Sequence, residues 1–271
     1  MKKTIGKTSA NLIEELYKQN KVIFNIEDVK KITNLSYFSA GRLISELKKR
    51  EIISSLKKGR HIIIPQEIGS VKKYIGNWFI AAKEIVNSQE YYISFYSAMS
   101  FWGMVTHPVN KIFISTSKRQ ITPKEMKGFL KFVFVDKKFI FGIVEKWIDK
   151  QKKVRFSDME KTILDCLLHP EYCGGIAEIA TGIYLVKDKI DFKKLFQYVR
   201  KYNKNVVAKR LGYILEILGI GNKEIYQNLR KYVKERYDLF DPCLPKKNLN
   251  RNDWRLIDNV SPEQIKKIIK T

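Results

Sequence analysis

The stretch REIISSLKKGRHIIIP, residues 50–65, decides the fold of the N-terminal part of this chain. Isoleucines at both ends flank a polar centre, and Gly59 lies where the chain needs a tight bend. Apolar β-branched residues around a short, glycine-containing turn are typical of a two-stranded β-hairpin. Lys57, Lys58 and Arg60 gather at the tip of this hairpin. Because neighbouring cations repel one another, this grouping favours an anionic partner over a plain solvated turn.

Three helices are predicted before the hairpin. Thr8 is expected to cap the first helix, and Asn25 the second, with Asp28 in the capping-box position. Ser36 is expected to cap the third helix, which should run to about Arg50 after a three-residue turn. The apolar spacing of this third helix predicts that its core-facing residues are Ala40, Leu43, Ile44 and Leu47.

Helix, helix, short turn, helix and hairpin, in this order, are typical of a winged helix-turn-helix domain. In such a domain the third helix enters the major groove of DNA, and the hairpin lies over phosphates or the minor groove. Phosphate contacts supply affinity without sequence information, whereas arginine can read guanine bidentately. We therefore predict binding of double-stranded DNA through Ser36, Tyr37, Ser39, Arg42, Lys49, Lys57, Lys58 and Arg60.

Some of these residues have a structural alternative. Ser36 could serve only as a helix cap, Tyr37 could pack on its own domain, and Lys49 could be a solvated surface residue. The fold also leaves an alternative open, because winged helices mediate protein contacts as well.

The charge of the whole chain agrees with a polyanionic partner. Its 52 basic and 28 acidic residues give a formal net charge of +24, and each third of the chain has an excess of basic residues. Charge therefore favours nucleic acid, but a lysine-rich background would look similar, and charge does not locate the contact surface. The three cysteines do not form a disulfide framework, and no segment predicts a signal peptide or a membrane span. We expect a cytoplasmic protein with no membrane partner.

The predicted fold class is α+β, in three parts: a winged helix-turn-helix over residues 1–68, a small α+β unit over 69–156, and a mainly helical region over 157–271 that is continuous with the middle unit. Two strands joined by a turn at 136–138 are expected in the middle part. A capping box from Ser157 to Glu160 is expected to open the helical region, which should form a bundle. Its outer faces are expected to be solvated, with contact to an acidic partner or to DNA as the alternative, and to carry Lys193, Lys194, Arg200, Lys201, Lys209, Arg210, Arg230, Lys231 and Lys234.

Two motifs carry a family resemblance: SAMSFWGM at 97–104, followed by IFIST, and FSDMEKTILDCLLHPEYCGGIAEIA at 156–180. Together they resemble the AbiEi family, the transcriptional-regulator antitoxins of type IV (abortive infection) toxin–antitoxin systems. The resemblance implies an N-terminal winged helix, repression of the protein's own operon, and a C-terminal region that counters a nucleotidyltransferase-like toxin. The resemblance implies no catalytic residue. The family's DNA-binding role transfers only to the positions of the third helix and the hairpin.

Three residues near the start of the helical region have a spacing found in zinc sites. Cys166, His169 and Cys173 have the spacing of part of a zinc site, but a closed site needs a fourth ligand, and Cys243 is the remaining cysteine. His169 would also suit the C-terminal end of a helix through its dipole. We expect no metal and no cofactor.

One pair of residues has a spacing found in nucleases. Asp136 and Lys138 have the D-x-K spacing of some nucleases, with Glu125 as a possible further carboxylate. A turn explains the pair more simply, and the sequence has no phosphate-binding glycine loop or hydrolase motif. We expect no enzyme. The alternatives left open are a magnesium-dependent nuclease with a winged-helix targeting domain and a winged-helix adaptor that binds protein.

Overall fold

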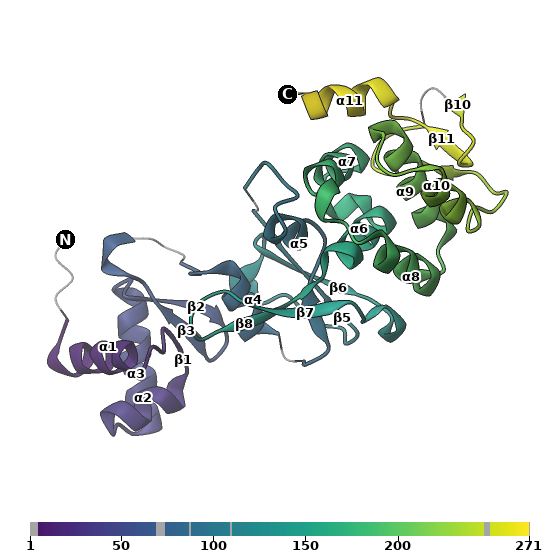
Figure 1. Cartoon of the computed structure of the whole chain (residues 1–271). Coiled ribbons are helices and arrows are strands. Elements are labelled where there is room, and N and C mark those ends of the chain that lie inside the picture. The colour runs from purple at the N-terminus through teal and green to yellow at the C-terminus, as the bar shows by residue number, and fades with distance from the viewer. Residues whose placement is uncertain (1–4, 69–73, 87, 109, 247–249, 271) are drawn as a thin grey trace. The chain divides into compact units, whose positions relative to one another are not determined.

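The computed structural model of the chain describes residues 5–68, 74–86, 88–108, 110–246 and 250–270. Over these residues the fold is mixed α and β, with eleven α-helices and three sheets, which confirms the expected mixture of the two kinds of element. The chain divides into two compact units (Figure 1). Unit 1 comprises Met1–Asn87 and Gln120–Leu130, and unit 2 comprises Ser88–Arg119 and Lys131–Thr271.

Unit 1 begins with three helices and a small sheet. The three strands follow the order β1-β3-β2, and both pairings are antiparallel. Its elements are α1 (Lys7–Lys18), β1 (Ile23–Phe24), α2 (Ile26–Thr33), α3 (Tyr37–Lys49), β2 (Ile53–Lys57), β3 (Arg60–Ile63), η1 (Gln66–Ile68), α4 (Trp78–Ile85) and η2 (Lys124–Met126).

The helix starts in unit 1 test the predicted caps. Asn25 and Asp28 form the predicted reciprocal capping box at α2, and the Ser36 side chain accepts from the backbone N–H of Ser39 at the start of α3. The Thr8 prediction is wrong, because α1 already begins at Lys7 and has Gly6 at its cap position. The Asn25 and Ser36 side chains satisfy backbone N–H groups that a helix leaves without partners, so they define where α2 and α3 begin.

The core of unit 1 fixes the orientation of α3. Ala40, Leu43, Ile44 and Leu47 are buried as predicted, against α1, α2 and the sheet. The hairpin β2–β3 is confirmed, with Gly59 at φ +74°, a left-handed conformation that favours glycine. Strand β1 was not predicted, because two residues are too short to show an alternating pattern.

Unit 2 contains a mixed five-stranded sheet of order β6-β5-β4-β8-β7, in which β4 and β8 are parallel. A small second sheet has the order β10-β11-β9. The elements are β4 (Tyr91–Ile93), α5 (Phe95–Phe101), β5 (Ile112–Thr116), β6 (Leu130–Phe134), η3 (Lys137–Phe139), β7 (Ile143–Trp147), β8 (Lys153–Ser157), α6 (Met159–Leu168), η4 (Pro170–Tyr172), α7 (Ile176–Leu185), η5 (Lys187–Lys189), α8 (Phe192–Tyr202), α9 (Asn205–Leu218), α10 (Lys223–Arg230), β9 (Asp238–Leu239), β10 (Asn250–Arg251), β11 (Leu256–Asp258) and α11 (Pro262–Lys270).

The order of this sheet corrects the expected connection at 136–138. Strands β6 and β7 are the two edges of the sheet, with three strands between them, so the segment that joins them is a crossover with the short helix η3. Figure 1 shows α6 to α10 grouped in the C-terminal part of unit 2. Helix α6 packs on α7, α8 and α9 and places its residues at the centre of the unit's core.

The start of α6 also differs from the prediction. Asp158, not Ser157, is the N-cap, and its side chain accepts from the backbone N–H of Lys161. Glu160 accepts from the backbone N–H of Asp191 and pairs with Lys194. Its carboxylate therefore contacts the start of α8 and does not complete a capping box. An aspartate caps a helix as well as a serine does, which is why sequence spacing did not separate the two.

Two of the nine basic residues expected on outer faces are buried. The Lys209 side chain is 0% exposed and pairs with Asp238. Arg210 donates to the carbonyl oxygens of Phe240, Leu167 and Leu239. Both residues hold the C-terminal segment that contains β9 against the helices, so they are structural and do not contribute to a basic surface.

None of the helices in the described part of the chain has the length and apolar character needed to cross a lipid bilayer. The domain boundaries expected at 68 and 156 stay a prediction, and the two compact units meet at residues 87/88, 119/120 and 130/131. Part of the segment after residue 68, at 69–73, lies outside the described residues.

Candidate nucleic-acid interface

One face of α3 is open to solvent and carries aromatic and basic side chains. Burial of Ala40, Leu43, Ile44 and Leu47 turns the opposite residues outward, and helical spacing places Phe38, Arg42, Ser45 and Lys49 along one exposed stripe. Phe38 is 68% exposed and Tyr37 is 65% exposed, which is unusual for side chains of this size. We name the stripe, together with Tyr37, the α3 face.

Aromatic and cationic groups on the α3 face contact one another. The Arg42 guanidinium lies 4.5 Å from the centroid of the Phe38 ring, and Lys30 of α2 lies 5.9 Å from that of Tyr37. Such cation–π contacts orient long basic side chains at the surface. The alternative that Tyr37 packs inside its own domain is excluded by its exposure.

Phe38 was not among the predicted contact residues. The helical spacing shared with Arg42 and Lys49 is visible in the sequence, but a phenylalanine beside a buried stripe is usually assigned to the core.

Ser36 and Ser39 are already engaged with each other. The Ser36 hydroxyl accepts from the Ser39 backbone at 3.2 Å, and the two hydroxyl oxygens lie 3.1 Å apart. Ser36 therefore has a structural role as the cap of α3, and its hydroxyl retains limited capacity for an outside partner.

The hairpin tip presents fewer free cations than the sequence suggested. Lys57 Nζ donates to the carbonyl oxygen of Ile85 at 3.0 Å, at the C-terminal end of α4, where a helix attracts cations. Burial, followed by the nearby charge of Arg60, lowers the pKa of Lys57. Lys58 is exposed and Arg60 is half-buried, so these two are the cations that the tip offers to a partner.

His61 follows the tip but faces the interior. It is 8% exposed, its Nδ1 lies 3.2 Å from the Ser55 hydroxyl, and its ring lies 5.8 Å from that of Phe24. Burial, and then the charge of Lys48, lowers the pKa of His61, so the ring stays neutral near pH 7. It contributes to the core of unit 1 and not to a charged surface.

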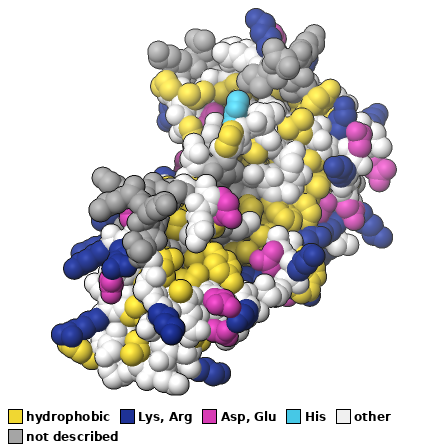
Figure 2. Space-filling view, turned by 90° about the vertical axis from the view of Figure 1, so that its left-hand side faces the viewer, with side chains coloured by type: hydrophobic (Ala, Val, Ile, Leu, Met, Phe, Trp, Pro, Cys, Tyr) yellow, Lys and Arg dark blue, Asp and Glu magenta, His cyan; other side chains and the backbone are white. Residues whose placement is uncertain are grey.

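On the face drawn in Figure 2, basic side chains are dispersed. Figure 2 shows lysine and arginine in separate groups over one face, interspersed with acidic side chains, and not as one continuous patch. In unit 2, Lys194 pairs with Asp158 and Glu160. The α3 face and the hairpin tip are distinguished by the arrangement of their aromatic and cationic side chains.

The candidate metal and nuclease residues do not form a ligand set among the described residues. Cys166 and Cys173 are buried, and His169 Nδ1 contacts Glu171 at 3.0 Å. Asp136 and Lys138 form an exposed ion pair with each other at 3.7 Å. Within the described ranges, no group of three or more His, Cys, Asp or Glu side chains is placed to hold a metal ion.

Comparisons with known proteins give a structural neighbour but no family. No family model matches the chain, and no curated protein matches it. The crystal structure of the RV2827C protein from Mycobacterium tuberculosis is similar, with a TM-score of 0.75 at 13% sequence identity over 99% of this chain and 96% of that one. At this identity the likeness concerns the fold, which both chains share along nearly their whole length.

Proposed function

We propose that this protein is a sequence-specific DNA-binding transcriptional repressor whose N-terminal elements form a winged helix-turn-helix. The observation that carries the proposal is the α3 face: an uncovered helix surface with Phe38, Arg42 and Lys49 in line, following α2 after a tight turn. The hairpin β2–β3 then supplies Lys58 and Arg60 at its tip. Helix, turn, helix and cationic hairpin are the parts that such a domain uses on DNA.

In this proposal each part has its own task. Helix α3 enters the major groove, where Arg42 donates to guanine and Phe38 packs on base edges such as a thymine methyl group. Lys58 and Arg60 contact phosphates and set the position of the domain without reading sequence. Lys57 donates to the end of α4 and so supports the hairpin, and it makes no direct contact with DNA.

The binding test uses a duplex from the region upstream of the protein's own gene, titrated by fluorescence anisotropy at several salt concentrations. Each phosphate contact contributes about −0.9 to the slope of log affinity against log salt, so Lys58→Ala/Arg60→Ala should flatten the slope by about 2. The matched control is Lys193→Ala/Arg200→Ala, which removes two exposed cations of α8. An unchanged slope in the first variant and a flattened slope in the control would move the contact to unit 2.

We further propose that the protein is the antitoxin of a type IV toxin–antitoxin system, autoregulates its operon, and counters a nucleotidyltransferase-like toxin through its C-terminal region. This rests on the AbiEi-like motifs at 97–116 and 156–180, the second of which forms the end of β8, α6, η4 and the start of α7.

A growth assay with the product of the neighbouring gene tests the antitoxin role. Expression of that product alone should stop growth, and co-expression of this protein should restore it. A variant with Arg42→Ala should still restore growth while losing repression, since the two roles use different regions. A neighbouring product with no effect on growth contradicts the antitoxin role.

A second candidate function is a winged-helix adaptor that binds protein. Exposed Tyr37 and Phe38 favour it, because aromatic side chains are enriched in protein interfaces. The same titration separates the two: an adaptor would show no preference between its own upstream duplex and a scrambled one, and Tyr37→Ala/Phe38→Ala would leave DNA affinity unchanged.

A further inference from the structure

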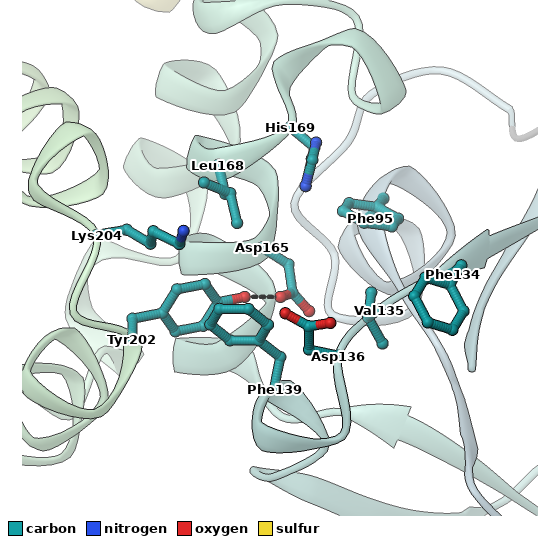
Figure 3. Close-up of a pocket in the computed structure, with 10 residues that line it drawn as sticks. All are labelled: Phe95, Phe134, Val135, Asp136, Phe139, Asp165, Leu168, His169, Tyr202 and Lys204. Atoms are coloured by element: carbon teal, nitrogen blue, oxygen red, sulfur yellow. Dashed lines mark hydrogen bonds between the residues drawn. The ribbon is translucent and has the colours of Figure 1, made fainter. Parts of the chain in front are cut away.

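Unit 2 contains a pocket to which none of the proposed roles assigns a ligand (Figure 3). Its volume is about 280 Å³, close to the lower end of the ~300–1,000 Å³ typical of small-molecule sites. It lies where α5, the β6–η3 segment, α6 and the α8–α9 junction meet. Its lining residues are Phe95, Phe134, Val135, Asp136, Phe139, Asp165, Leu168, His169, Tyr202 and Lys204.

The walls of this pocket are mainly aromatic. The Phe139 and Tyr202 rings lie 5.1 Å apart on one side, and Phe95 meets His169 edge-on at 5.8 Å on the other. Phe95 has φ +52°, a left-handed conformation that costs energy for a bulky residue and is frequent at ligand sites. Flat aromatic walls with few polar groups suit a planar, largely apolar ligand.

Asp165 gives the pocket a buried acceptor. The residue is 3% exposed, and its Oδ1 accepts from the Tyr202 hydroxyl and from Lys161 Nζ. Its Oδ2 has no hydrogen-bond partner among the residues that the structure describes. Figure 3 shows this second oxygen directed away from Tyr202, toward the side of Val135 and Asp136. A buried acceptor without a donor is costly, and a ligand that donates to it removes that cost.

The surrounding groups hold Asp165 in place. Lys161 is fully buried, and its Nζ also donates to the hydroxyls of Tyr92 at 3.2 Å and Tyr202 at 2.9 Å. Burial, reinforced by the charge of Asp165, raises the pKa of Tyr202, so its hydroxyl stays protonated and remains a donor. The carboxylate is therefore fixed before any ligand arrives, which reduces the entropic cost of binding.

Charge around the pocket selects against a cation. Lys161 compensates Asp165, Lys138 pairs with Asp136 at 3.7 Å, and Lys204 adds a further ammonium group to the lining. A second positive charge would meet these ammonium groups. A neutral N–H group satisfies Asp165 without this repulsion.

We propose that this pocket binds a small, neutral, planar nitrogen heterocycle, whose ring N–H or amino group donates to Asp165 Oδ2 and whose ring packs between Phe139 and Phe95. This site is independent of the DNA-binding proposal, since it uses no residue of unit 1.

The first test compares indole with benzofuran, which has the same shape but an oxygen in place of the N–H group. Both are titrated against the full-length protein by saturation-transfer NMR. Indole should bind at least tenfold more tightly, because benzofuran cannot donate to Asp165. Adenine, a donor through its amino group, should compete with indole. Equal binding of indole and benzofuran, or no binding of indole, would overturn the proposal.

Variants then locate the contact. In Asp165→Asn the amide oxygen is expected to keep the position that receives Lys161 and Tyr202, which turns the NH₂ group toward the ligand and should weaken indole binding at least tenfold. Phe139→Ala should weaken both probes and decides the test if Asp165→Asn fails to fold. Trp147→Ala, an exposed aromatic residue outside the lining, should change neither. Indole affinity that survives both lining variants contradicts the assignment.

Discussion

Helices α3 and α6 both carry charged residues, but they place them in opposite environments. On α3, Arg42 and Lys49 lie in solvent along the α3 face. On α6, Lys161 and Asp165 are buried among aromatic rings and pair with each other. The comparison teaches that charge on a helix predicts a partner surface only where packing leaves that face uncovered. Elsewhere the same residue types form an internal network, whose desolvation must be offset by hydrogen bonds.

The substitution with the largest expected effect breaks the internal network of α6. Lys161→Met leaves the Asp165 carboxylate buried without its cation and should lower the free energy of unfolding by about 3–5 kcal/mol. Urea denaturation followed by circular dichroism measures this. The control Lys193→Met, at an exposed position of α8, should change stability by less than about 0.5 kcal/mol. Lys161→Met/Asp165→Leu should recover much of the loss, and a double variant as unstable as the single one contradicts a paired network.

The same type of change on α3 should spare stability and affect binding. Arg42→Ala should leave the free energy of unfolding within about 0.5 kcal/mol and weaken binding to the specific duplex by about 1–3 kcal/mol, since a bidentate arginine–guanine contact is lost. Anisotropy titrations against specific and scrambled duplexes measure the effect. Arg200→Ala on α8 is the matched control. A loss that is equal for both duplexes would show that Arg42 contacts phosphate and reads no base.

Ser36 allows the capping role to be separated from a DNA contact. Ser36→Ala should cost about 1 kcal/mol of stability, because the Ser39 backbone N–H loses its acceptor. Ser36→Asp should retain the cap, since aspartate is an equally good N-cap, but place a negative charge beside the proposed phosphate path. Weaker DNA binding with unchanged stability in Ser36→Asp is the expected result. Unchanged affinity would place the start of α3 away from DNA.

The smallest effect concerns pH. The pKa of His61 is lowered by burial, so below the unfolded value of about 6.5 the unfolded chain takes up a proton before the folded one does. Its contribution to stability is complete above about pH 6.5 and is lost as pH falls. Unfolding free energies at about pH 7.5 and about pH 5.5 should differ less in His61→Gln than in the parent. His107→Gln, at an exposed position, is the control. An unchanged pH dependence in His61→Gln excludes His61 as its source.

Much of the local structure follows from short sequence patterns. The starts of α2 and α3 at Asn25 and Ser36 were predicted from single capping residues, and the buried side of α3 from its spacing. The hairpin followed from Gly59 between β-branched runs. These features depend on interactions within a few residues, so the sequence by itself determines them.

Other features depend on contacts between distant segments. Sequence spacing does not show that Lys57 caps α4, that Lys209 and Arg210 are buried, or that β6 and β7 occupy opposite edges of a sheet. The partner of each of these residues or strands comes from another part of the chain, and burial decides whether a charge is a surface group or an internal one. The sequence thus determined the helices and the hairpin, whereas the tertiary structure decided which cations remain open to a partner and where Asp165 meets a pocket.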